Sequence, residues 1–163
     1  MQKNWMPFVL NNHICFVYSV NPHIIYKCDE STGECTKLAE TTNPTISTSI
    51  RGGSQVQLYK GQYIAFTHKR DANRYRTQIY AFSPQYPYHV THITDDFMFA
   101  TGANVSNLLV QFVAGFDIKD DIAYVTYGEQ DCHAKVCRIP MKRIMDALKP
   151  VDTSKLEISN RID

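Results

Sequence analysis

Two short segments carry the residue types best suited to chemistry in this chain. The first reads Arg51-Gly52-Gly53-Ser54-Gln55, in which a guanidinium lies beside the bare backbone N–H groups of two glycines. This combination suits phosphate or a sugar hydroxyl, although a glycine-rich turn with a solvated arginine is the alternative. The second ends at His68, after an apolar run, where an imidazole can donate to an anion or take part in proton transfer. The alternative for His68 is a hydrogen-bonded histidine at a strand end.

Three further residues are open to a chemical and a structural interpretation. Tyr75 lies between two arginines close to His68, so its segment is either part of an anion-binding wall or a strand edge protected by charge. Asp131 follows a predicted strand, where its carboxylate either binds sugar hydroxyls or caps a turn, and we favour the turn. Trp5 is the single tryptophan and offers a platform for a pyranose face, but we expect it to pack in the core.

The elements that must position these residues follow a repeated pattern. Two apolar runs joined by a tight turn occur at residues 7–19, 55–68 and 111–128. Their starts lie roughly 50 residues apart, which is the period of a four-stranded propeller blade. Propellers usually have about four to eight blades, so three do not close a ring. The sequence therefore predicts an all-β fold, a partial β-propeller of about three four-stranded blades, with a short C-terminal helix.

The boundaries of these units can be placed from turn residues and from one proline. We predict a domain over residues 1–150, followed by a polar tail, 151–163, that is either loose or closes a sheet edge. Residues 41–49 read as an exposed loop and residues 117–121 as a turn. Pro140 favours a helix start. The predicted parts are blades at about 5–45, 50–100 and 107–140, and a helix at 140–149.

The inner strand of each blade lines the central channel of a propeller, so the residues before each unit are expected to meet at one mouth. The segments concerned are residues 3–5, 51–55 and 107–111. No catalytic residue and no metal ligand set is identified. The predicted sugar- or phosphate-binding residues are Lys3, Asn4, Arg51, Gly52, Gly53, Gln55, His68, Tyr75 and Asp131.

Composition excludes several function classes. The chain has 163 residues, 44% of them hydrophobic, which is enough for a folded domain with a substantial core. The net charge is +1 and the basic residues are dispersed, so we expect no nucleic-acid partner and no membrane partner. The first residues lead straight into a strand and no apolar run reaches membrane-spanning length, so we expect a cytoplasmic protein.

The five cysteines predict reduced thiols, because the count is odd and no export signal is visible. Cross-strand bridges between Cys28 and Cys35, or between Cys132 and Cys137, remain geometrically open in an oxidising setting. Neither spacing matches a common zinc pattern. A metal site is therefore not expected.

Six short segments carry a family resemblance through their sequences and their order. They are KNWMPF at 3–8, FVYSVNP at 16–22, RGGSQ at 51–55, AFTH at 65–68, FVAG at 112–115 and YGEQD at 127–131. In this order they resemble the glycoside hydrolase family 130-like proteins, and the resemblance covers about residues 2–145. This family includes β-mannoside phosphorylases and β-1,2-mannosidases. The likeness is strongest to an uncharacterised group of relatives found in bacteria and large DNA viruses, some fused to glycosyltransferase domains.

The resemblance implies a five-bladed propeller with a central sugar site, of which this chain looks like the C-terminal three blades. In phosphorylases of the family, inorganic phosphate attacks the anomeric carbon with inversion, while an aspartic acid delivers a proton through a sugar hydroxyl. By motif position, Arg51 and His68 look like members of the phosphate pocket and Asp131 like a sugar-contacting carboxylate. Lys3 and Asn4 are expected to line the same mouth. Inorganic phosphate is the one co-substrate implied, with no other cofactor.

The sequence departs from the family pattern at the groups that transfer protons. The general-acid aspartate belongs to N-terminal blades that have no counterpart in this sequence. Gln2 and Gln111 stand where relatives tend to have glutamate, and an amide cannot act as acid or base. We therefore expect a carbohydrate-active module that is incomplete as an enzyme on its own. The alternative is a non-catalytic glycan- or partner-binding fragment, in a viral or host-cell setting, that forms a homo-oligomer or associates with the missing blades.

Overall fold

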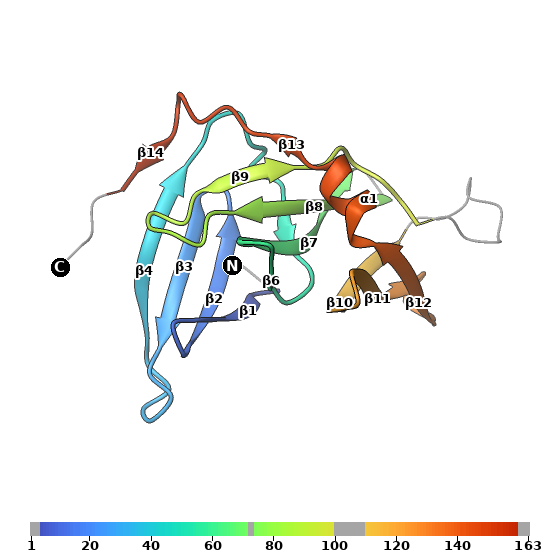
Figure 1. The fold of residues 1–163 in the computed structure, drawn as a ribbon, viewed down its shortest axis with the longest axis horizontal. Helices are drawn as coiled ribbons and strands as arrows, with labels where there is room; N and C mark the ends of the chain where they lie inside the picture. Colours follow the sequence, from blue (N-terminus) through green and yellow to red (C-terminus); the bar gives the residue numbers. More distant parts are fainter. Residues whose placement is uncertain (1–3, 72–73, 100–109, 160–163) are drawn as a thin grey trace.

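The computed structural model describes residues 4–71, 74–99 and 110–159, which form three antiparallel sheets and one short helix (Figure 1). The fold is therefore all-β, as predicted. The first sheet is a meander whose outer edge is completed by a strand from the end of the chain. Its strands, in spatial order, are β1 (Met6–Leu10), β2 (His13–Val20), β3 (His23–Cys28), β4 (Cys35–Thr42) and β14 (Glu157–Ile158).

The second sheet lies in the middle of the molecule and the third at its other end (Figure 1). The helix α1 (Met141–Ala147) follows the third sheet directly, close to the predicted position. The second sheet comprises β13 (Lys149–Pro150), β9 (Val90–Ile93), β8 (Arg74–Phe82), β7 (Gln62–Asp71) and β5 (Arg51–Gly52), with β6 (Gln57–Tyr59) also paired to β7. The third sheet comprises β10 (Gln111–Lys119), β11 (Ile122–Glu129) and β12 (His133–Pro140).

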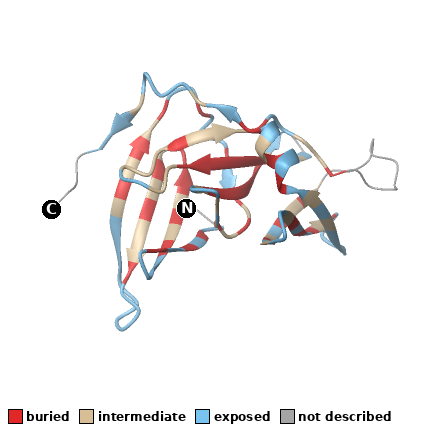
Figure 2. Cartoon of the chain, viewed as in Figure 1, coloured by how far each residue is buried: buried red, intermediate tan, exposed pale blue. Residues whose placement is uncertain are grey.

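Two hydrophobic cores hold the three sheets together. The first lies between the first and second sheets and the other between the second sheet, the third sheet and α1. Successive side chains of a strand point to opposite faces, so a run of buried residues means that both faces are covered. β7 and β8 show such runs, whereas β2 and β11 alternate between buried and accessible positions (Figure 2). Among the described residues, the central sheet is thus the one packed on both sides.

The hairpins follow the sequence prediction closely, with one correction. Asn11 and Asn12 form the two-residue turn between β1 and β2, with φ values of 50° and 61°. The predicted turn at residues 117–121 is too long, because β10 continues to Lys119 and the turn consists of Asp120 and Asp121, at φ values of 52° and 57°. Two residues with positive φ form the tight hairpin turn that matches strand twist, and Asp tolerates this conformation.

The prediction of an exposed loop over residues 41–49 is wrong for its first half. Asn43 and Ile46 are buried. The reason is the buried Asn21, whose Nδ2 donates to the carbonyl oxygens of Asn43 at 3.0 Å and Ile46 at 2.7 Å, while its Oδ1 accepts from the Asn43 N–H at 3.1 Å. The polar composition of this segment reflects hydrogen bonds made inside the protein.

The C-terminal residues close sheet edges, which is one of the two predicted alternatives. β13 pairs with β9 and β14 pairs with β4, so the segment between them links the outer edges of the second and first sheets. Val151 donates to Thr91 at 2.9 Å and Ser159 donates to Glu40 at 3.0 Å. The described part of the tail is therefore an ordered strap.

The cysteine prediction is wrong for one pair. Cys28 and Cys35 form a disulfide, since the hairpin between β3 and β4 places them directly opposite each other with Cα atoms 3.9 Å apart. The turn is fixed by Asp29, whose carboxylate accepts from Ser31. Among the described residues the free cysteines are Cys15, Cys132 and Cys137.

The helix is too short to cross a membrane. The helix of the described region, α1, is 7 residues long and amphipathic, with Met141 and Ile144 buried. In the described ranges there is no helix with the length and apolar character that crossing a bilayer requires.

Candidate functional site

The two segments singled out by their chemistry lie side by side. Arg51 and Gly52 form the short strand β5, which pairs with the middle of β7 so that Arg51 lies opposite His68. This strand was not predicted. The pairing brings together two residues that are 17 positions apart in the printed sequence, and it fixes the backbone on which both side chains are carried.

The two glycines are needed for close packing of the backbone. A Cβ atom on Gly52 would lie 2.0 Å from the carbonyl oxygen of Asn4, and one on Gly53 would lie 2.7 Å from the carbonyl oxygen of Phe66. Since no side chain fits at such distances, chain packing accounts for both glycines. It also places Asn4 against β5, next to Arg51. The role of the glycine N–H groups as ligand donors stays a prediction.

His68 is enclosed by aromatic rings. Its imidazole is 7% exposed, stacks on the ring of Tyr75 with centroids 5.3 Å apart, and meets the edge of Phe112 at 5.1 Å. Within the part of the chain that the structure describes, the buried Nδ1 atom has no hydrogen-bond partner. The sequence missed Phe112, because nothing in it indicated that β10 reaches the end of β7.

Burial sets the charge of this histidine. Desolvation lowers the pKa of His68, an interaction with the Gly52 backbone raises it, and the positive charge of Arg51 lowers it further. Since the ordinary value is about 6.5, the imidazole is neutral at neutral pH. A neutral ring offers one N–H donor and one acceptor, so His68 is fitted to hydrogen bonding of a hydroxyl group or an anion.

Arg51 supplies the positive charge next to this ring. Its side chain is exposed, and Nη1 donates to the carbonyl oxygens of Thr48 at 2.7 Å and Ile50 at 3.0 Å. These two bonds hold the guanidinium over the turn before β5. Arg51, His68, Tyr75 and the Asn4 backbone thus gather at one end of β5 and β7.

Two other predicted residues lie elsewhere, and one is outside the description. The Gln55 amide is used between sheets, since its Nε2 donates to the Phe116 carbonyl oxygen and its Oε1 accepts from the Phe116 N–H at 3.3 Å. Asp131 occupies the turn after β11, at a φ of 56°, and lines an open hollow of about 720 Å³ formed with residues of β10, β11 and β12. Lys3 lies outside the described residues.

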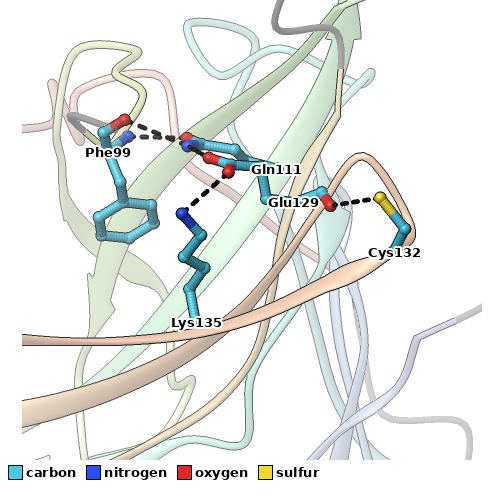
Figure 3. A network of polar contacts seen from close by, with 5 residues as sticks. All are labelled: Phe99, Gln111, Glu129, Cys132 and Lys135. Atoms are coloured by element: carbon cyan, nitrogen blue, oxygen red, sulfur yellow. Dashed lines mark hydrogen bonds and ion pairs between the residues drawn. The ribbon is translucent and has the colours of Figure 1, made fainter. Parts of the chain in front are cut away.

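A buried polar network next to the site was not predicted (Figure 3). The side chain of Gln111 is fully buried, accepting from the Phe99 N–H at 2.8 Å and donating to the Phe99 carbonyl oxygen at 3.1 Å. The same Nε2 donates to the carboxylate of Glu129 at 3.3 Å, and Lys135 forms an ion pair with Glu129 at 3.2 Å. The Cys132 thiol lies at the Glu129 carbonyl oxygen, 3.9 Å away.

This network positions the start of β10, and therefore Phe112 against His68. A signal for it was present in the sequence, because a strand has a period of two and Gln111 shares a face with the buried Val113. With Glu129 buried and paired to Lys135, every polar group of the network has a partner. The amide therefore has a structural role.

The described residues hold no metal-binding cluster. Over residues 4–71, 74–99 and 110–159, no three side chains of His, Cys, Asp or Glu gather as ligands of one ion. The side chains that gather at the end of β5 and β7 supply a guanidinium, an imidazole and aromatic rings.

Comparison with known proteins extends this description to the fold. No family model matches the sequence, and no curated protein matches it. One solved structure that does match in three dimensions is the β-1,2-mannobiose phosphorylase from Listeria innocua in complex with β-1,2-mannobiose, with a TM-score of 0.67 and 18% identity. The alignment covers 89% of this chain and 46% of that chain, so this chain spans about half the length of the enzyme. In fold, the chain is similar to this part of a β-1,2-mannobiose phosphorylase.

Proposed function

We propose that this chain is a carbohydrate-active module whose three sheets are blades of a partial β-propeller. The observation that carries the proposal is the likeness in fold to a mannoside phosphorylase over 89% of the chain. In the proposed arrangement the domain covers residues 1–150 and the sugar or phosphate binds where β5 and β7 end. The ligand is a glycan or sugar, with inorganic phosphate as co-substrate.

The contacts at this end of the sheet support binding of an anion. Arg51 contributes a guanidinium group, and a hydrogen bond from a charged group is stronger than one between neutral groups. His68, whose pKa is lowered by burial, is neutral and adds one directional hydrogen bond to the ligand but no charge. Tyr75 fixes the plane of the imidazole by stacking on it. In this scheme Arg51 binds a phosphate oxygen, and His68 binds a hydroxyl group or a further oxygen. Asn4 lies at the rim of the proposed site.

The network around Gln111 favours incomplete catalysis. Its amide cannot transfer a proton, and the neighbouring Glu129 is buried in an ion pair with Lys135. We therefore assign no catalytic residue. The second candidate function, a non-catalytic glycan- or partner-binding fragment, is favoured by the same observation, since a fully satisfied network needs no reaction to account for it.

Calorimetry with inorganic phosphate and with β-1,2-mannobiose tests the proposed site. Arg51→Ala is expected to weaken phosphate binding by about 1.5 to 3 kcal/mol, or about 10- to 150-fold, which is the contribution of a charged hydrogen bond. Arg143→Ala is the matched control, because Arg143 is an exposed arginine on α1. Equal affinities of wild type and Arg51→Ala, or absence of binding by the wild type, would contradict the proposal.

Turnover separates the two candidate functions. The wild type is incubated with β-1,2-mannobiose, with and without phosphate, and loss of the disaccharide is followed. Phosphate-dependent loss assigns the chain to the enzymes. Binding without loss assigns it to the non-catalytic modules.

A further inference from the structure

A two-stranded ribbon extends from the proposed site. β7 and β8 pair without a break to the ends nearest their turn, whereas β5 accompanies β7 only as far as His68. On the other side, β9 pairs with β8 over residues 80–82. Within the described ranges, residues 69–71 and 74–76 therefore pair as strands only with one another. We call these six residues the basic ribbon.

The basic ribbon concentrates positive charge. Residues 69–76 include four basic side chains and one acidic side chain, a charge of +3, whereas the whole chain has +1. The rest of the chain therefore has a net charge of −2. One of the four cations is neutralised locally, because Lys69 forms an ion pair with Asp96 at 2.5 Å. Strand pairing thus gathers the remaining charges into one patch beside the proposed site.

Strand alternation divides this patch between two faces. Phe66 of β7 belongs to the core against the third sheet, so His68 and Arg70, which follow it at a period of two, lie on the same face. Directly opposite residues of antiparallel strands also share a face, which adds Arg51 and Tyr75. We call this surface the site face; it consists of Arg51, His68, Arg70 and Tyr75. The other face of the ribbon consists of Lys69, Asp71, Arg74 and Arg76.

The site face carries two guanidinium groups and no carboxylate from its own strands. Arg70 lies one strand across and two residues along from Arg51, which places their Cα atoms about 8 Å apart. Arg70 is exposed, and a guanidinium has five N–H donors, enough to bind a ligand in addition to groups of the protein. Since Arg51 is assigned to phosphate, Arg70 supplies a second cation for a second negative group.

We propose that the sugar bound at this site is acidic, and that Arg70 binds a carboxylate of the glycan while Arg51 binds phosphate. A guanidinium matches a carboxylate through two parallel hydrogen bonds, which gives Arg70 a role in selecting the ligand. A neutral mannoside would make no use of this charge. The inference rests on the function proposed above and names the class of sugar, an oligosaccharide that contains uronic acid.

A short glycan fits the ribbon better than a nucleic acid does. A two-stranded ribbon can enter the major groove of DNA, but a protein that binds duplex DNA typically makes about 6 to 10 phosphate contacts, and the site face offers two cations. Single strands stack their bases on exposed aromatic rings, whereas the Tyr75 ring already stacks on His68. The net charge of −2 on the rest of the chain also repels a long polyanion.

Calorimetry with two matched tetrasaccharides tests the proposal on the full chain. β-1,4-Mannotetraose and β-1,4-tetramannuronate share their backbone and linkage and differ at C6, where the second has carboxylates. At low salt the wild type is expected to bind tetramannuronate at least about 5-fold more tightly, the effect of one exposed ion pair. The preference should shrink in about 0.5 M salt, because salt screens exposed charges. Equal affinities at low salt, a preference that salt leaves unchanged, or binding of neither tetrasaccharide overturns the proposal.

Two arginines of the ribbon separate a defined contact from general attraction. Arg70→Ala is expected to lower the affinity for tetramannuronate about 5-fold and to leave the affinity for mannotetraose unchanged. Arg74→Ala is the matched control, because Arg74 is an exposed arginine of the same ribbon but lies on its other face. It should change the affinity for tetramannuronate less than about 2-fold. Equal losses in the two variants would mean that the ribbon attracts anions without a defined contact, and would overturn the role of Arg70.

Further measurements on the same samples keep this inference apart from the proposed function. Arg70→Ala should retain the phosphate affinity of the wild type, whereas Arg51→Ala should lose it. Binding of phosphate and β-1,2-mannobiose without a preference for tetramannuronate overturns the acidic sugar alone, and absence of all binding overturns the proposed function with it. Tighter binding of octathymidylate than of tetramannuronate would overturn the proposal in favour of nucleic acid. Near-UV circular dichroism verifies that each variant folds.

Discussion

Replacing the buried amide of the polar network by a carboxylate, Gln111→Glu, is expected to destabilise the protein strongly at neutral pH. The new side chain still accepts from the Phe99 N–H but no longer donates to the Phe99 carbonyl oxygen or to Glu129, two bonds of 3.1 Å and 3.3 Å. An orphaned buried acceptor costs about 1 to 3 kcal/mol. A buried carboxylate without a partner costs about 3 to 5 kcal/mol, and Lys135, already paired to Glu129, offsets only part of it.

The expected loss is therefore about 3 to 5 kcal/mol at pH 7, measured by urea denaturation followed by far-UV circular dichroism. The loss has a definite pH dependence. The folded state raises the pKa of the added carboxyl group above its unfolded value of about 4.3, so the penalty is absent below that value and grows as pH rises towards the folded pKa. The difference between variant and wild type should therefore be about 1 to 2 kcal/mol smaller at pH 5 than at pH 7.

Two controls separate charge from shape. Gln111→Met removes the same hydrogen bonds without adding a titrating group, so its difference from wild type should not change with pH. The double variant with Glu129→Gln restores one amide and one carboxylate to the network and should recover most of the stability. A loss below about 1 kcal/mol at pH 7, or a loss that grows as pH falls, would refute the reasoning.

Three further predictions test other parts of the structure. Burial lowers the pKa of His23 from 6.5 to about 3, so the stability of the folded protein falls as pH drops from 6.5 towards 3. Urea denaturation should therefore give a free energy of unfolding about 2 kcal/mol lower at pH 5 than at pH 7. In His23→Gln, which lacks the titrating ring, this difference between the two pH values should be much smaller. Gly52→Ala places a Cβ atom 2.0 Å from a backbone oxygen and should cost about 1 to 3 kcal/mol in thermal melts, whereas Gly128→Ala, which meets nothing within 4 Å, should be tolerated. Cys28→Ser opens a disulfide of sequence separation 7 and should cost about 2 to 3 kcal/mol under oxidising conditions, while Cys132→Ser, at an exposed free thiol, should be neutral; equal effects of the two would contradict the assignment.

The strands were largely predictable from sequence because their hydrophobic patterns are local. Phe8, Val17 and Ile25 in the first sheet mark buried positions in runs bounded by turn residues, and tight turns such as Asn11-Asn12 reveal themselves by composition. The middle sheet was recognisable for the same reason. Its β7 and β8 each contain a short continuous apolar run, at residues 63–66 and 79–82.

The remainder depends on contacts between residues far apart in sequence. Asn21 buries the segment around Asn43, and Gln55 bonds to the backbone of Phe116, 61 residues later; no local pattern encodes either contact. The exposure of Trp5 was also not predicted. Tryptophan usually packs against other side chains, but the sequence does not show whether another element covers this position. In the candidate site, the sequence predicted that Arg51 and His68 lie close together. Of the two rings that contact His68, it placed Tyr75 nearby but missed Phe112.

At the outer edge of the first sheet, Thr41 and Thr42 of β4 cannot pair with β14 during synthesis until the strap has been made. Asn43, at the end of β4, bonds through its Nδ2 to the carbonyl oxygen of Asp152, 109 residues later, and β14 follows after that. At about 5 to 20 residues per second, a ribosome needs about 5 to 20 s to cover this distance. For that time this end of β4 presents free N–H and C=O groups, which pair readily with strands of other chains. Neighbouring nascent chains on one messenger are therefore expected to join at this end of β4 when translation is slow.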